Sequence, residues 1–76
     1  MDLRDMFATN LRRVRHLRGM FQDDLAYGAN VSRSYLGQLE KGTFFAGLRI
    51  VGKFSAALGV EPAELLRFPP KRARKR

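Results

Sequence analysis

Two short helical segments joined by a tight turn occupy residues 22–41, and no other feature of the chain constrains its fold as strongly. In the first segment Leu25 is apolar and Ala26 is small, and a small side chain lets two steeply crossing helices approach closely. Asn30 follows at the turn, where a left-handed backbone suits Gly best and Asn next best. Val31, the next residue, is apolar and is expected to be buried. This order predicts two short helices that cross at a tight turn.

The second segment has one apolar side and one polar side. Ser32 is a good N-cap, because its hydroxyl can accept a hydrogen bond from a free amide at the helix start. At about 100° per residue, Leu36 and Leu39 fall on one side of the helix. The opposite side carries Arg33, Ser34, Gly37, Gln38 and Lys41. One side can anchor the helix while the other faces a groove, which is the plan of a helix-turn-helix that places a helix in the DNA major groove.

The apolar spacing in the rest of the chain predicts an all-α fold of five helices. We expect the first helix over residues 2–18, with Asp2 as its N-cap, and the fourth over residues 48–58. Pro62 suits the first position of a fifth helix. Three helices are expected to end at Gly19, Gly42 and Gly59. The buried residues predicted outside the motif are Leu3, Met6, Phe7, Leu11, Val14, Leu17, Val51, Phe54, Leu58, Leu65 and Leu66.

The formal net charge of +8 is concentrated at the C-terminus. Of the 15 Lys and Arg residues, five lie within residues 71–76, which leaves ten basic and seven acidic residues in the rest of the chain. We expect one domain over residues 1–68 and a disordered basic tail over residues 69–76. The tail has three interpretations: an electrostatic arm on DNA, a membrane-surface or nuclear-import signal, or a solubilising end. The excess of positive charge favours polyanionic partners.

Composition argues against several functional classes. The chain contains no Cys, which excludes disulfides and thiolate metal sites and is compatible with a reducing cytoplasm. Its apolar runs are far shorter than the ~20 residues that span a bilayer, so we expect a cytoplasmic protein with no membrane partner. The single His, His16, is expected on the polar side of the first helix, and no Gly-rich phosphate loop is present. We therefore expect no enzyme activity, no cofactor and no metal ion.

With these residues in place, the chain resembles the phage-repressor family, the Cro/cI or XRE group of helix-turn-helix DNA-binding proteins. The likeness covers roughly residues 7–66 and rests, in the order expected for the family, on Leu11-Arg12-Arg13-Val14-Arg15, Gly19-Met20, Gln38-Leu39-Glu40-Lys41-Gly42 and Leu58-Gly59-Val60-Glu61-Pro62-Ala63-Glu64-Leu65-Leu66. The resemblance implies a compact lambda-repressor-like domain that regulates transcription, as a repressor or an activator. It would bind double-stranded DNA as a homodimer on a two-fold symmetric operator, with residues 32–40 as the recognition helix.

The resemblance also implies roles for particular side chains. The expected DNA base contacts are Arg33, Ser34 and Gln38. The expected phosphate contacts are Gln22, Ser32, Tyr35, Lys41 and Thr43. Arg15 and Glu40 are expected to form a partly buried ion pair that orients the first helix against the third. The alternatives are a solvated surface charge for Arg33, and for Tyr35 a packed ring with its hydroxyl in water. A solvated face is the simplest interpretation of Arg4, Arg12, Arg13 and Arg18, and an approach of some of them to phosphate is the alternative.

Apolar residues outside the motif leave a second function open. Phe44 and Phe45 occupy a loop where the family tends to carry polar or basic residues, and Leu66 with Phe68 forms a rival surface. Each cluster is either a dimer interface or ordinary core packing. The alternative function is an antitoxin or accessory module that binds a protein partner through the Phe44/Phe45 surface. Phe21 also departs from the family pattern, because it stands where Ser or Thr usually caps the second helix.

Overall fold

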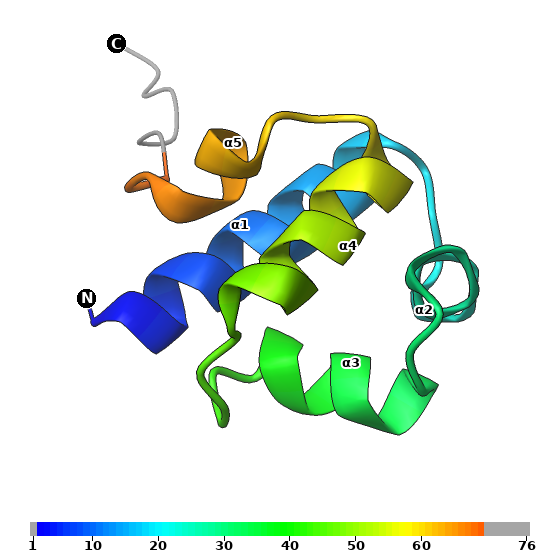
Figure 1. Ribbon diagram of the computed structural model, residues 1–76, viewed down its shortest axis with the longest axis horizontal. Helices are drawn as coiled ribbons and strands as arrows, with labels where there is room; N and C mark the ends of the chain where they lie inside the picture. The colour runs from blue at the N-terminus through cyan, green and yellow to red at the C-terminus, as the bar shows by residue number, and fades with distance from the viewer. Residues whose placement is uncertain (1, 70–76) are drawn as a thin grey trace, which may run out of the picture.

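The computed structural model describes residues 2–69, which form the expected all-α fold of five helices. The basic tail expected over residues 69–76 lies, apart from Pro69, outside the described residues. The helices, labelled in Figure 1, are α1 (Leu3–Leu17), α2 (Gln22–Ala29), α3 (Arg33–Glu40), α4 (Leu48–Leu58) and α5 (Pro62–Leu66).

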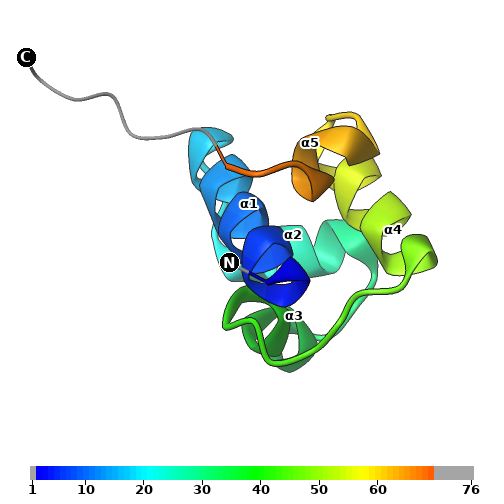
Figure 2. The ribbon, with the colours of Figure 1, turned by 90° about the vertical axis from the view of Figure 1, so that its left-hand side faces the viewer.

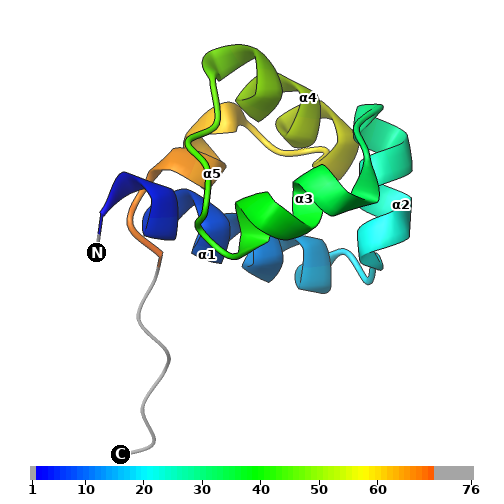
Figure 3. The same cartoon turned by 90° about the horizontal axis from the view of Figure 1, so that it is seen from below.

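The helices enclose one core, with α3 and α5 on opposite sides of it. Figures 1 and 2 both place α3 at the bottom and α5 at the top, where α5 packs against α1 and α4. α2 packs against α3 and α4 and crosses α3 steeply, so the two motif helices meet at their shared turn. Figure 3, seen from below, brings α3 to the front. One side of α3 therefore faces away from the core.

All five helices contribute apolar side chains to the core. Leu25, Leu36 and Leu65 are fully buried, which anchors α2, α3 and α5. Phe7 and Phe54 join α1 to α4 with ring centroids 6.5 Å apart and planes at 49°, an arrangement that aromatic rings favour. The buried cluster comprises Phe7, Leu11, Val14, Leu25, Ala26, Ala29, Leu36, Leu39, Val51, Phe54, Leu58 and Leu65.

Local hydrogen bonds set the helix ends. Asp2 caps α1 by accepting from the Asp5 backbone N–H at 3.0 Å, and this bond holds the pKa of the Asp2 carboxyl below its usual value. Asn30 closes α2 with φ 58° and ψ 47°, the predicted left-handed conformation. Phe21 provides no side-chain cap, but its N–H donates to the Asp24 carboxylate at 2.8 Å. Asp24 thus offsets part of the missing cap at the start of α2.

Three residues predicted to be buried are exposed, so that part of the core prediction is wrong. Leu3 and Leu17 are the first and last residues of α1 and are 64% and 73% exposed, because the ends of α1 lie at the margin of the bundle. Leu66 is also exposed, because its neighbour Leu65 occupies the core side of the short α5.

A buried polar side chain joins α1 to the end of α5. Asn10 is fully buried, and its Nδ2 donates to the carbonyls of Leu65 at 3.1 Å and Arg67 at 2.6 Å. Its Oδ1 accepts from Arg13 Nη2 at 3.2 Å. Burial of an amide is tolerated here because both of its polar atoms have partners.

A buried ion pair joins α1 to the end of α3. Arg15 Nε donates to Glu40 Oε2 at 2.7 Å, and Arg15 Nη2 donates to Glu40 Oε1 at 3.0 Å. Both residues are buried, and the paired geometry is the strong form of an arginine–carboxylate contact. Arg15 Nη1 also donates to the carbonyl of Met20 at 2.9 Å. One guanidinium therefore fixes both α3 and the loop before α2 against α1.

The left-handed turn at Asn30 can be tested by substitution. Asn30→Gly should keep the free energy of unfolding or raise it slightly, since Gly adopts positive φ without strain. Asn30→Val should lower it by about 1 to 2 kcal/mol, the cost of a left-handed conformation for a residue with a bulky side chain. Urea unfolding followed by circular dichroism measures both variants. Equal stability of the two would contradict a left-handed turn here.

Removal of one partner of the Arg15–Glu40 pair should destabilise the fold. Glu40→Ala leaves a buried guanidinium without its counter-ion, and we expect the free energy of unfolding to fall by about 3 to 5 kcal/mol. Glu64→Ala is the control, because it removes an acid from a largely exposed ion pair with Arg67 and should cost less than about 1 kcal/mol. Thermal and urea unfolding compare the two. Similar losses in both variants would show that the pair contributes no more than a surface contact.

Candidate nucleic-acid interface

α3 keeps its apolar side in the core and its polar side outside. Leu36 and Leu39 are fully buried. Ser32 Oγ accepts from the Tyr35 backbone N–H at 3.0 Å and so caps the helix as predicted. The opposite side carries the three predicted base-contact residues, Arg33, Ser34 and Gln38. The anchoring residues and the predicted base-contact residues are therefore on opposite sides of one helix.

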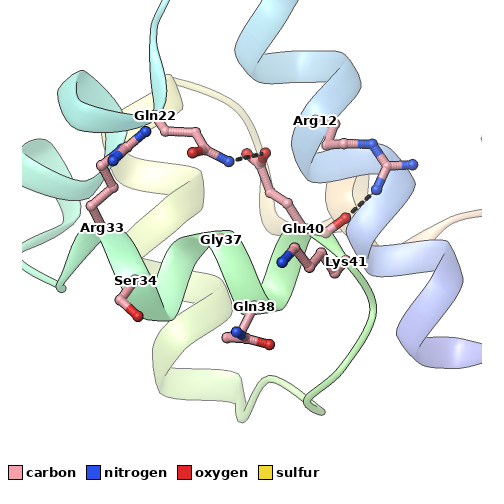
Figure 4. Close-up of a pocket in the computed structure, with 8 residues that line it drawn as sticks. All are labelled: Arg12, Gln22, Arg33, Ser34, Gly37, Gln38, Glu40 and Lys41. Carbon is pink, nitrogen blue, oxygen red and sulfur yellow. Dashed lines mark hydrogen bonds between the residues drawn. The ribbon is translucent and has the colours of Figure 1, made fainter.

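An open depression runs along the outer side of α3. Arg12 reaches it from α1 and Gln22 from α2, and the remaining residues belong to α3 and its C-cap, Lys41. The lining residues, drawn in Figure 4, are Arg12, Gln22, Arg33, Ser34, Gly37, Gln38, Glu40 and Lys41. The depression thus brings the predicted base contacts together with two of the predicted phosphate contacts, Gln22 and Lys41.

The Gln22 side chain is held at the edge of this depression. Its Nε2 donates to Glu40 Oε1 at 2.9 Å, as a dashed line in Figure 4 marks. A side-chain amide nitrogen carries two hydrogens, so a second hydrogen remains for another acceptor. Because Glu40 also pairs with Arg15, the position of Gln22 depends on the buried ion pair.

Arg33 is paired with an acidic residue of α2. Its Nε lies 3.0 Å from Asp23 Oδ1, and the two side chains are 65% and 77% exposed. In Figure 4 the Arg33 side chain turns toward Gln22 at the start of α2, whereas the Ser34 and Gln38 side chains project in a different direction, away from Gln22. The sequence pattern does not indicate this ion pair, because the two residues meet only when α2 folds across α3.

The interpretation of Arg12 as a solvated residue is wrong. Its Nη1 donates to the backbone carbonyl of Glu40 at the C-terminal end of α3, a helix end that favours a cation. Arg18 acts similarly at the end of α4, where its Nε donates to the Leu58 carbonyl at 2.9 Å. The sequence did hold a signal for this contact. Arg12 precedes Arg15 by three residues and therefore lies on the same face of α1, which faces the end of α3.

Three predicted phosphate contacts, Ser32, Tyr35 and Thr43, lie outside the lining of the depression. The Ser32 hydroxyl oxygen accepts the helix-cap hydrogen bond, which leaves the hydroxyl hydrogen for another acceptor. The Tyr35 ring is partly buried and stacks on Phe44, with centroids 6.1 Å apart and planes at 26°, as the packed-ring alternative expected. Thr43 is exposed beyond the end of α3. Phosphate contacts at these three positions stay predictions.

The described part of the chain contains neither a metal-binding cluster nor a membrane-spanning helix. Within residues 2–69, no three His, Cys, Asp or Glu side chains gather so that they could hold a metal ion. No helix in that part is long and apolar enough to cross a membrane. His16 is exposed on α1.

Comparison with known proteins agrees with this architecture. A family model described as a helix-turn-helix domain matches residues 7–68. The control protein C.BamHI of Bacillus amyloliquefaciens is 35% identical over 68 residues, which are 88% of this chain and 84% of that protein. The restriction-modification controller protein C.AhdI from Aeromonas hydrophila has a similar structure, with a TM-score of 0.80 and 35% identity over 83% of this chain and 96% of that chain.

A hypothetical transcription factor from Neisseria has a TM-score of 0.86 and 35% identity over 90% of this chain and 78% of that chain. The region matched by the family model contains both motif helices and most of the core that holds them. The chain therefore belongs to the helix-turn-helix family in its Cro/cI or XRE group, a family of DNA-binding transcriptional regulators rather than enzymes.

Proposed function

We propose that this protein regulates transcription in the bacterial cytoplasm as a homodimer, with α3 of each copy in the major groove of a two-fold symmetric operator. The proposal rests on the different surroundings of the two sides of α3. Leu36 and Leu39 on one side are fully buried, and the opposite side borders an open depression. The relatives that are named control or controller proteins support a regulatory role.

Base contacts would come from three side chains of α3. Arg33 can donate to both O6 and N7 of guanine, and Gln38 can pair with adenine in a similar way. Ser34 can donate or accept, so it discriminates less among bases. At Gly37 an added Cβ would meet no protein atom within 4 Å, so the missing side chain leaves space outside the core, where DNA can approach the helix.

Phosphate contacts would position α3 without specifying the sequence. Gln22 keeps one amide hydrogen beyond the one it gives to Glu40, and it lies at the N-terminus of α2, where the helix dipole favours an anion. Lys41 offers an ammonium group just beyond the C-terminal end of α3, and Arg12 adds a guanidinium to the same depression. The flanking candidates are Ser32, Tyr35 and Thr43.

Arg33→Ala tests whether α3 reads bases. With an operator selected from a random DNA pool, we expect the preference for operator over random DNA to fall about tenfold or more, because a bidentate guanine contact is worth about 1 to 3 kcal/mol. Arg67→Ala is the matched control, because it removes the same charge beside α5, on the opposite side of the molecule from α3.

Fluorescence anisotropy titrations measure both affinities, and circular dichroism checks the fold of each variant. The control should keep the operator preference. A further variant replaces Arg33, Ser34 and Gln38 together by Ala. If it keeps the same preference for operator over random DNA, α3 does not read the bases directly.

Homodimer formation would use an apolar surface that joins two of the predicted clusters. Phe45 from the α3–α4 loop and Leu66 from α5 line the same small apolar depression, together with Leu3. Phe45 is 69% exposed, whereas Phe44 is partly covered by its stacking on Tyr35. A dimer is needed because one recognition helix reads few base pairs, and two such helices about 34 Å apart read two half-sites whose centres are one turn of DNA apart.

Phe45→Glu tests this interface. A carboxylate cannot be buried without cost in an apolar contact, so we expect the variant to be monomeric and to bind the operator more weakly. Tyr27→Glu, on a side chain of α2 that is 90% exposed, is the control and should stay dimeric. Analytical ultracentrifugation measures the mass of each. A Phe45→Glu protein that stays dimeric with normal operator affinity would place the dimer interface elsewhere.

A further inference from the structure

The ion pair between Asp23 and Arg33, on the outer surface of α3, is a contact that the proposed DNA contacts do not explain. Asp24, the next residue, accepts the Phe21 N–H and so helps to start α2. Asp23 makes no such bond, and its Oδ1 lies 3.0 Å from Arg33 Nε. An exposed carboxylate beside a DNA-facing helix repels phosphate, so it weakens binding to DNA of any sequence. The Asp23 carboxylate therefore needs a function that offsets this loss of DNA affinity.

We propose that Asp23 is a positioning residue that sets the preference of Arg33 for guanine. The guanidinium is planar and carries five N–H donors, and its Nε lies 3.0 Å from Asp23 Oδ1. The two terminal nitrogens, Nη1 and Nη2, form a separate edge of the same plane, which a contact at Nε leaves free. That free edge matches the O6 and N7 acceptors of guanine, which need two parallel donors. The inference rests on the proposed function, in which Arg33 contacts a base.

Asp23 can restrain Arg33 because α2 is itself fixed. Leu25 and Ala26 bury the other side of α2 in the core, and Gln22 is tied to Glu40. An arginine without such a partner has many rotamers and can swing onto a phosphate, which DNA of every sequence supplies. The carboxylate therefore has two effects: it favours the contact of Arg33 with guanine, and it disfavours contacts with phosphate, which carry no sequence information.

The expected effect of Asp23 on the base preference of Arg33 is small, because both side chains are exposed to solvent. Both side chains are more than half exposed, so solvent and salt screen the pair, and contacts of this kind change an equilibrium by about two- to fivefold. The effect should be larger at low ionic strength, because the Debye length increases as salt is removed.

The experiment compares Asp23→Ala with Asp24→Asn in the full chain. Both changes remove one negative charge from the first turn of α2, but Asp24→Asn keeps an acceptor for the Phe21 N–H and does not touch Arg33. A third variant, Asp23→Asn, removes the charge and keeps an acceptor for Arg33 Nε. Anisotropy titrations use the selected operator, an operator with the preferred guanine replaced in both half-sites, and random DNA.

We expect Asp23→Ala and Asp24→Asn both to bind random DNA more tightly. Asp23→Ala alone should lower the ratio of operator to random affinity by a further two- to fivefold, with the loss at the guanine position. Asp23→Asn should recover part of that ratio. In an Arg33→Ala background, Asp23→Ala should change the ratio no more than Asp24→Asn does, because the two residues then no longer interact.

Two results would overturn the inference, and they are distinguishable. If Arg33→Ala lowers the operator preference but Asp23→Ala and Asp24→Asn change it equally, Asp23 acts only as a charge and the proposed function stands. If Arg33→Ala leaves the preference intact, the proposed base contact fails, and the inference fails with it.

Discussion

The Arg15–Glu40 ion pair is the contact on which the position of the proposed DNA-binding surface depends. A buried guanidinium loses its hydration, and it recovers that cost only through well-aligned partners. Arg15 makes three hydrogen bonds to two partners, two to Glu40 and one to the Met20 carbonyl. Glu40 also accepts from Gln22. One pair therefore orients α1, the loop before α2 and both motif helices, and a base contact needs this because hydrogen bonds tolerate only small shifts in position.

The charges around α3 are mixed rather than uniformly basic, and the two ends of the helix carry different sets of charged groups. Lys41 and Arg12 lie at the end of α3, where positive charge attracts phosphate whatever the sequence. Arg33 lies at the start of α3, with its Nε 3.0 Å from the Asp23 carboxylate. In the proposed complex, general affinity would come from one end of the helix and discrimination among bases from the other.

The candidate site was predictable to the extent that it lies on one helix or follows the family resemblance. Ser32 as the cap of α3, Leu36 and Leu39 as its anchors and the exposure of Arg33 all follow from spacing within two turns. Arg12 was not predicted, because its partner is a backbone carbonyl 28 residues away. Periodicity indicates which side of a helix is polar, but not which polar groups meet across the bundle.

The sequence by itself determined the five helices, their ends and the left-handed turn at Asn30, because these depend on residues close together in the chain. The tertiary structure decided the contacts between distant segments. It buried Asn10 against the end of α5, left Leu3 exposed at the margin of the bundle and placed Asp23 beside Arg33. The physical reason is that helix propensity and capping are local, whereas burial and ion pairing require the helices to be packed first.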